Sequence, residues 1–200
     1  MRQPPLCFGG SFNPIHFGHL RCAQAAALAR GFDEVLLIPN AQPPHKPPSA
    51  DFASADDRLA MARLAISTVQ PPPLFTADDL ELRRAGPSYT IDTVTELLGR
   101  GWPEVWWLVG ADMLNYLPKW HRAEELVAKC HFLILQRPGV SLNWDALPNE
   151  MVSRLKDNVV PAPLVDISST EIRRRVRAGE PINGMTPEAV IDYIAQNNLY

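Results

Sequence analysis

Residues 6–20 read Leu6-Cys7-Phe8-Gly9-Gly10-Ser11-Phe12-Asn13-Pro14-Ile15-His16-Phe17-Gly18-His19-Leu20, and this stretch decides the fold. The apolar run Leu6–Phe8 predicts a buried strand, the glycine pair predicts a turn, and the Ala/Leu-rich segment Gly18–Arg30 predicts a helix. The next apolar run, Val35–Ile38, completes a strand–helix–strand pattern. Such a pattern is typical of proteins with a parallel sheet.

The rest of the chain repeats this alternation. Helices are predicted from Ser54 to about Val69, over Thr90–Leu98, from about Ser169 to Arg177 and over Pro187–Asn197. Further strands are predicted at Val105–Val109, Phe132–Leu135 and near Leu164–Ile167. The fold class is therefore α/β, with a doubly wound, mostly parallel, Rossmann-like sheet and a small helical C-terminal part. In such a sheet, ligands bind beyond the carboxyl ends of the strands.

Composition excludes several function classes. The chain has 200 residues, of which 46% are hydrophobic, and this length favours a single domain over residues 1–200. The formal net charge of -3 argues against a nucleic-acid-binding surface and fits a small anionic ligand better. Cys7, Cys22 and Cys130 lack C-x-x-C spacing, so they predict buried thiols in a reducing compartment. With no signal peptide and no run of ~18 apolar residues, we expect a cytoplasmic protein without a membrane partner.

The segment after the first strand has the features of a phosphate site. Gly9 and Gly10 let the main chain approach a ligand, and the helix start offers N–H donors and the positive end of a dipole. His16 and His19 are three residues apart with Gly18 between them, so that two imidazoles can face one phosphate. The segment matches neither the G-x-x-x-x-G-K-[ST] loop nor the G-x-G-x-x-G fingerprint. Taken singly, such glycines and histidines are often structural.

The combined string G-G-S-F-N-P-x-H-x-G-H-L resembles the signature of the H-x-G-H nucleotidyltransferase superfamily, in its nicotinate-nucleotide adenylyltransferase branch. Further matching segments are Pro44-His45-Lys46, Pro87-Ser88-Tyr89-Thr90-Ile91-Asp92-Thr93, Gly110-Ala111-Asp112, Trp120, Arg137-Pro138-Gly139 and Ile167-Ser168-Ser169-Thr170-Glu171-Ile172-Arg173. The resemblance thus covers nearly the whole chain. It implies transfer of AMP from ATP to nicotinate mononucleotide, which gives nicotinate adenine dinucleotide and pyrophosphate in NAD biosynthesis.

The resemblance also implies roles for individual residues. The catalytic set is His16, His19, Lys46 and Arg173, in which the two histidines hold the α-phosphate and stabilise its developing charge. The ATP-binding set is Gly9, Gly10, Ser11, Phe12, His16, His19, Gly110, Asp112, Ile167, Ser168, Ser169, Thr170 and Arg173. The part from about residue 165 completes the ATP site, because its helix start and Arg173 face the β- and γ-phosphates. Read without the resemblance, Asp112 and the serine run are simply helix caps.

The acceptor-binding set implied by the resemblance is Asn40, His45, Lys46, Tyr89, Thr90, Tyr116, Trp120 and Arg137. Tyr116 and Trp120, with Thr90 opposite, resemble a pocket for the pyridine ring, which stacks well on indole. Lys46 reaches phosphates from its loop, although a lysine in a polar linker is otherwise a solvated cation. No protein metal ligand is assigned, and Mg²⁺ is expected to enter with ATP because it binds phosphates and keeps water ligands.

Two rival functions stay open from the sequence. One is another enzyme of the superfamily, such as a pantetheine-phosphate adenylyltransferase or a cytidylyltransferase, and the other is a non-catalytic nucleotide-binding module. The segment Ser88-Tyr89-Thr90 and Trp120 favour the nicotinate branch. Retention of both histidines, Lys46 and Arg173 argues against an inactive module. The role of residues 141–160 and the oligomeric state stay open as well.

Overall fold

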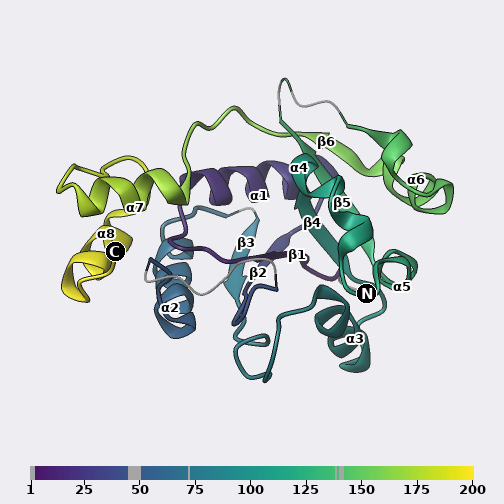
Figure 1. Ribbon diagram of the computed structural model, residues 1–200, viewed down its shortest axis with the longest axis horizontal. Coiled ribbons are helices and arrows are strands. Elements are labelled where there is room, and N and C mark those ends of the chain that lie inside the picture. The colour runs from purple at the N-terminus through teal and green to yellow at the C-terminus, as the bar shows by residue number, and fades with distance from the viewer. Residues whose placement is uncertain (1–2, 45–50, 72, 138, 140–141) are drawn as a thin grey trace.

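The computed structural model describes residues 3–44, 51–71, 73–137, 139 and 142–200. Its centre is a parallel six-stranded sheet in the order β3-β2-β1-β4-β5-β6 (Figure 1). The strands are β1 (Leu6–Gly10), β2 (Glu34–Pro39), β3 (Leu74–Ala77), β4 (Trp106–Gly110), β5 (His131–Gln136) and β6 (Val159–Pro161). The predicted doubly wound α/β fold is confirmed.

Helices connect the strands and cover both faces of the sheet (Figure 1). The α-helices are α1 (Phe17–Arg30), α2 (Ala55–Ile66), α3 (Thr90–Gly99), α4 (Ala111–Leu114), α5 (Ala123–Lys129), α6 (Asn149–Leu155), α7 (Ser169–Arg177) and α8 (Glu188–Gln196). Short 3₁₀ turns lie at η1 (Leu117–Lys119), η2 (Trp144–Ala146) and η3 (Lys156–Asn158). Within the described residues, no helix is both long and apolar enough to span a bilayer.

The strands supply two cores because successive side chains point to opposite faces of a sheet. Leu6 and Leu37 belong to one core, which also contains buried residues of α1, α2, α7 and α8. Their chain neighbours Cys7 and Ile38 belong to the other core, with buried residues of α3, α5 and α6. Both faces are thus covered, as expected for parallel strands that read as continuous apolar runs.

One predicted strand is wrong. Residues Leu164–Ile167 form no strand, and the sixth strand is Val159–Pro161, which pairs with β5. Leu164 is 85% exposed. Proline has no N–H to donate to a ladder, so Pro161 and Pro163 end the pairing before Leu164 is reached. The segment 141–160, left open above, contributes η2, α6, η3 and the first two residues of β6.

The topology places a crevice between β1 and β4. The strands β2 and β3 lie on one side of β1, whereas β4, β5 and β6 lie on the other, so the strand order reverses at this point. Open α/β sheets bind ligands at such a switch point, outside the carboxyl ends of the strands. Here those ends are Gly10 and Gly110.

Candidate active site

The glycines of the first strand are required by close packing. A Cβ built on Gly9 lies 2.4 Å from Cζ2 of Trp107, so any side chain at Gly9 displaces the indole of the neighbouring strand. A Cβ on Gly18 lies 2.8 Å from Nδ1 of His16. Gly9 therefore lets the main chain pass close to the Trp107 ring, and Gly18 lets the His16 ring lie over the start of α1.

His16 and His19 form a reciprocal cap at the start of α1. The His19 main-chain N–H donates to Nδ1 of His16 at 3.4 Å, and the His16 main-chain N–H donates to Nδ1 of His19 at 3.3 Å. The two rings stack with their centroids 3.7 Å apart. Because each Nδ1 accepts a hydrogen bond, a neutral ring carries its proton on Nε2. The helix start therefore presents Nε2–H groups as hydrogen-bond donors.

His16 stays neutral at physiological pH. Its side chain is buried, with 6% exposure, and burial lowers its pKa to about 4, helped by the positive charge of Arg137. A neutral imidazole with its proton on Nε2 donates a hydrogen bond without acting as a general acid. This suits a group that stabilises charge on a phosphate rather than one that transfers a proton.

The lowered pKa of His16 makes stability depend on pH. The unfolded chain takes up a proton near the ordinary His pKa of 6.5, while the folded chain resists protonation until about 4. The contribution of His16 to the free energy of unfolding is therefore fully present above about pH 6.5 and is lost as the pH falls towards 4. The loss is about 2 kcal/mol between about pH 7.5 and about pH 5. Urea unfolding of wild type and His16→Asn at both pH values checks this. Equal pH dependence in both proteins would contradict it.

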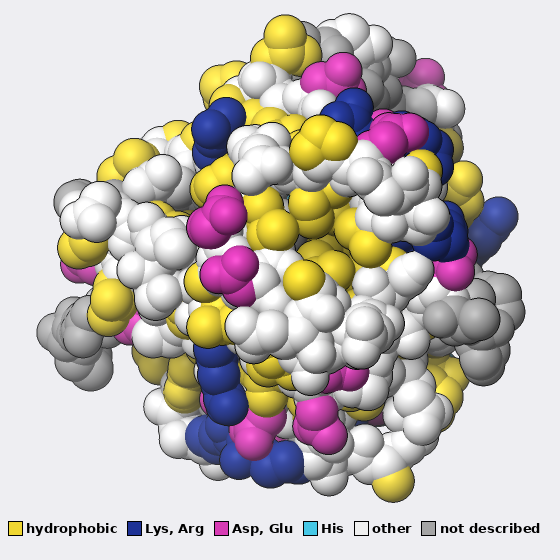
Figure 2. Space-filling view, turned by 90° about the vertical axis from the view of Figure 1, so that its left-hand side faces the viewer, with side chains coloured by type: hydrophobic (Ala, Val, Ile, Leu, Met, Phe, Trp, Pro, Cys, Tyr) yellow, Lys and Arg dark blue, Asp and Glu magenta, His cyan; other side chains and the backbone are white. Residues whose placement is uncertain are grey.

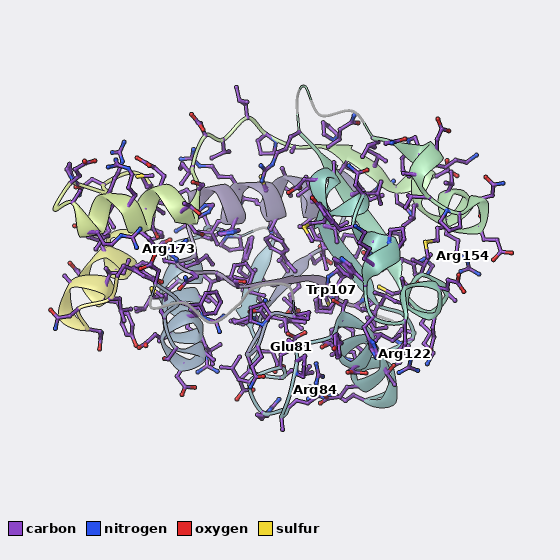
Figure 3. The ribbon with its side chains drawn as sticks, viewed as in Figure 1. Glu81, Arg84, Trp107, Arg122, Arg154 and Arg173 are labelled. Atoms are coloured by element: carbon purple, nitrogen blue, oxygen red, sulfur yellow. The ribbon has the colours of Figure 1, made fainter. Side chains whose placement is uncertain are left out.

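The C-terminal part holds the loop before α1 through its carbonyl groups. Arg173 Nη1 donates to the Asn13 carbonyl at 2.8 Å, and Ser169 Oγ donates to the Pro14 carbonyl at 2.9 Å. Thr186 Oγ1 donates to the Ile15 carbonyl at 2.8 Å. Figure 3 shows Arg173 beneath α7. The last part of the chain therefore holds the loop that carries the histidines.

Arg173 differs from the other arginines of α7. Its Nε is buried and has no hydrogen-bond partner among the described residues. Arg174 and Arg175, in contrast, form ion pairs with Glu171, and Arg174 also pairs with Glu180. Figure 2 views this end of the molecule and shows Lys and Arg side chains beside Asp and Glu side chains. Arg173 therefore differs from Arg174 and Arg175 in contacting the loop before α1 instead of forming an ion pair.

A cavity of about 290 Å³ opens at the crevice between β1 and β4. The residues around it include eight of the predicted site residues, namely Gly9, Gly10, Ser11, Asn40, Tyr89, Thr90, Gly110 and Trp120. Trp107 and Glu81 also line it, and both lie near the middle of the molecule in Figure 3. A concave site at the switch point of an α/β sheet is a typical position for binding a small ligand.

One wall of the cavity is aromatic and consists of Tyr89, Trp120 and His121. The Tyr89 and His121 rings stack with centroids 4.2 Å apart, and both line the cavity together with Trp120. Trp120 Nε1 is buried without a hydrogen-bond partner in the described part of the chain. The rings of this wall offer a bound planar ring a stacking surface.

Some predicted residues lie away from the cavity. Tyr116 is 56% exposed and is not among the lining residues, although it was predicted to share the pyridine pocket with Trp120. Asp112 is exposed in the first turn of α4. Arg137 follows β5, and its charge acts on His16, so it lies on the side of the histidines. The predicted residues His45 and Lys46 fall outside the described residues.

The remaining ATP-set residues lie at the two helix starts. Phe12 is buried below Gly10 and packs edge-on against the His19 ring, 5.2 Å between centroids. Ser168 Oγ caps α7 by accepting from the Glu171 N–H at 3.2 Å. The carbonyl of Ile167 lies near Gly18, and Thr170 Oγ1 accepts from Arg173 Nη2 at 3.5 Å. The start of α7 thus lies against the start of α1.

Sequence reasoning missed two buried charged residues beside the site. Glu81 lines the cavity, accepts from Thr93 Oγ1 at 2.6 Å, and has its pKa raised by burial. Arg58 lies in α2 and donates to the Ser11 carbonyl at 2.7 Å. The available signal for Arg58 was its spacing, since Arg58, Met61 and Ala65 share the apolar face of the helix.

The donors around the site are of the kind that bind anions. They are imidazoles, hydroxyl groups, main-chain N–H groups and guanidinium groups. Among the residues that the structure describes, no three His, Cys, Asp or Glu side chains gather as a metal site. This donor set fits phosphate groups, which would bring a metal ion with them.

Comparisons with known proteins agree with this geometry. The family model for cytidylyltransferase-like proteins matches residues 7–175. A relative from Herpetosiphon aurantiacus, named "Probable nicotinate-nucleotide adenylyltransferase", is 45% identical over 195 residues and 96% of each chain. A relative of the same name from Roseiflexus is 38% identical over 203 residues, with both chains fully covered.

Solved structures agree on the fold. The structure of Plasmodium falciparum nicotinic acid mononucleotide adenylyltransferase complexed with NaAD has a TM-score of 0.80 at 20% identity and covers 100% of this chain and 98% of its own. The same enzyme complexed with APC has a TM-score of 0.77 at 18% identity, with the same coverage.

Proposed function

The chain belongs to the nicotinate-nucleotide adenylyltransferase family of cytidylyltransferase-like proteins, and from this premise we infer that it transfers AMP from ATP to nicotinate mononucleotide. The products are nicotinate adenine dinucleotide and pyrophosphate. The observation that carries this function is the pair of histidines at the start of α1, beside an aromatic cavity at the switch point of the sheet. An adenylyl transferase needs these two features side by side, one for the reacting phosphate and one for the acceptor ring.

The reaction needs positioning and charge stabilisation more than a protein nucleophile. An oxygen of the acceptor's phosphate bonds to the α-phosphorus of ATP, and the bond from that phosphorus to the bridging oxygen breaks, so that pyrophosphate leaves with the electron pair. The phosphate is already ionised near neutrality. We assign the Nε2–H groups of His16 and His19 to the α-phosphate oxygens, where donors fixed in advance stabilise the transition state.

The two substrates divide the site between them. ATP is assigned to the starts of α1 and α7, with Arg173, Ser168 and Thr170 at its β- and γ-phosphates. Nicotinate mononucleotide is assigned to the cavity, with its pyridine ring on the aromatic wall and its phosphate towards Ser11 and Asn40. This arrangement brings the attacking phosphate to the carboxyl end of β1, next to the histidines.

Three further assignments concern the metal ion, the domain organisation and the location of the protein. Mg²⁺, held chiefly by the ATP phosphates and water, neutralises phosphate charge when bound. Residues 1–200 are assigned to one domain, because α8 packs on α2 and Tyr193 Oη donates to Asp57 at 2.9 Å. A cytoplasmic location is supported by Cys7, Cys22 and Cys130, which are all free thiols.

The proposed function is tested by pyrophosphate release. The protein is incubated with ATP, Mg²⁺ and one of three acceptors: nicotinate mononucleotide, nicotinamide mononucleotide or pantetheine phosphate. Release with nicotinate mononucleotide, together with its conversion to the dinucleotide, is the expected result. Release only with pantetheine phosphate would assign the chain to the rival enzyme, and no release with any acceptor would leave a nucleotide-binding module.

Trp120 gives a prediction specific to the acceptor. Its indole lines the cavity, and its buried Nε1 lacks a protein partner, so we expect Trp120→Ala to raise the acceptor KM by ~10-fold or more, the loss of one aromatic stack. Affinity for ATP should stay nearly unchanged. Steady-state kinetics with each substrate varied in turn measures both, with the exposed Tyr116→Ala as the matched control. Equal weakening of both substrates would make Trp120 a packing residue only.

A further inference from the structure

Arg58 is a buried cation without a carboxylate partner. It is 1% exposed, yet no Asp or Glu of the described residues lies within ion-pair distance of it. Instead its guanidinium donates to four neutral oxygens. These are the carbonyls of Ser11 at 2.7 Å, Ala53 at 3.1 Å and Ala41 at 3.3 Å, and Oδ1 of Asn40 at 3.4 Å.

An unpaired buried charge is costly, and so it calls for an explanation. Burial lowers the pKa of Arg58 to about 10, which leaves the group charged at neutral pH. The guanidinium lies beneath the ends of β1 and β2, since Ser11 follows β1 and Asn40 follows β2. The charge therefore lies where an anionic ligand would balance it.

Arg58 also decides which way the Asn40 side chain faces. A guanidinium has donors and no acceptor, so it binds only the Oδ1 end of the amide. The Nδ2 end is consequently directed to Oγ of Ser11, at 3.4 Å. Both Asn40 and Ser11 line the cavity. Arg58 thus orients the Asn40 amide so that its Nδ2–H groups face the site.

We propose that Arg58 is a positioning residue for the phosphate of the acceptor, acting through Asn40 and Ser11 and through its own charge, which no carboxylate of the described residues neutralises. The inference rests on the proposed function and extends it to a residue outside the H-x-G-H motif that is not among the residues lining the cavity between β1 and β4. The ligand class is a phosphomonoester. The same ligand without its phosphate gains nothing from Arg58.

The test compares ligands with and without the phosphate. Binding of nicotinate mononucleotide and of nicotinate riboside is measured by calorimetry with wild type, Arg58→Gln and Arg58→Lys. We expect Arg58→Gln to lower the affinity for the mononucleotide and, in pyrophosphate-release kinetics, to lower its kcat/KM by ~10²-fold, the effect of a displaced positioning group. Its affinity for the riboside should stay within about threefold of wild type, because the aromatic wall is untouched. Arg58→Lys keeps the charge and should recover part of the loss.

Two controls separate positioning from folding. Arg63→Gln removes an exposed arginine of the same helix and should leave kinetics unchanged. Asn40→Ala, alone and combined with Arg58→Gln, should show non-additive losses, because both changes remove the same oriented donor. If thermal unfolding shows that Arg58→Gln is not folded, Arg58→Lys and the Arg58→Lys/Asn40→Ala double variant take its place. The criterion is again whether the losses are non-additive and confined to the mononucleotide.

Equal losses for mononucleotide and riboside, or additive losses in the double variant, would overturn the proposal and make Arg58 a structural crosslink. The proposed function fails differently, because the wild type then releases no pyrophosphate with nicotinate mononucleotide. If another phosphorylated acceptor reacts, the same comparison is made with that acceptor and with its dephosphorylated form. With no reacting acceptor, mononucleotide binding that is unchanged in Arg58→Gln would overturn the inference, while weakened binding would support it.

Discussion

His19→Ala is expected to lower turnover by ~10²-fold or more, the usual effect of deleting a preorganised donor to developing charge. The stacked His16 and His19 rings share one helix start, and each Nδ1 is engaged by a main-chain N–H. The Nε2–H of His19 is then the group lost from the transition state. Single-turnover kinetics at saturating ATP and acceptor measures the chemical step directly.

His19→Asn is the matched variant, because Oδ1 of asparagine can accept from the His16 N–H as Nδ1 does. His19→Ala removes that cap and should cost about 1 kcal/mol of unfolding free energy, whereas His19→Asn should cost less. Both variants should lose turnover to a similar extent, since neither has Nε2. Turnover restored by asparagine would mean that His19 only shapes the start of the helix.

The sequence predicted the sheet where periodicity and apolar runs agree with burial. The runs Leu6–Phe8, Val35–Ile38 and Phe132–Leu135 lie within strands of the structure, and Val105–Val109 overlaps β4, which begins at Trp106. β3 was not predicted, because only four residues pair and Pro73 precedes them. The predicted strand near Leu164 is wrong although most of its residues are apolar, because it follows Pro161 and Pro163 and finds no strand to pair with among the described residues, and Leu164 is 85% exposed. Short edge strands depend on pairing partners that a local pattern does not contain.

The site residues also divide into those that the sequence predicted and those that it did not. Gly9, Ser11 and Asn40 were predicted through the resemblance, and the structure brings them to one cavity. Arg58 and Glu81 were not, because arginine and glutamate side chains are expected at the surface of a protein. Their importance comes from burial, and burial of a charge is decided by elements distant in sequence. A charged residue on the apolar face of a predicted helix is the sequence signal that deserves more weight.

The family and the function were predicted with the correct branch, and both are confirmed by relatives that match over nearly the whole chain. Roles of individual residues stay predictions. The structure nevertheless sharpens them, because it ties three carbonyls of the loop before α1 to side chains from the last part of the chain. The two ends of the sequence therefore meet at the loop before α1, and under the proposed function we expect substitutions in α7 to weaken ATP binding.

Arg173→Ala should weaken the binding of ATP much more than the binding of AMP. Arg173 lies one turn after the hydroxyl groups that begin α7, on the same face as Thr170. Its Nη1 is engaged by the Asn13 carbonyl, while its Nε is buried without a partner among the described residues. A guanidinium fixed in this way keeps donors for an anion, and only ATP carries β- and γ-phosphates. Loss of the charge-assisted bond should cost about 1.5–3 kcal/mol for ATP, or roughly 10- to 150-fold in Kd.

Arg174→Ala is the control for Arg173→Ala, because Arg174 is the next arginine of α7 and is already paired with Glu171 and Glu180. It should leave both nucleotides bound as in wild type. Titration of ATP and AMP against the three proteins separates two roles of Arg173. If its bond to Asn13 matters most, the loop that carries His16 moves, and AMP weakens in parallel with ATP because both bear an α-phosphate. A loss confined to ATP means that the guanidinium binds the pyrophosphate end, which is the part of ATP that leaves.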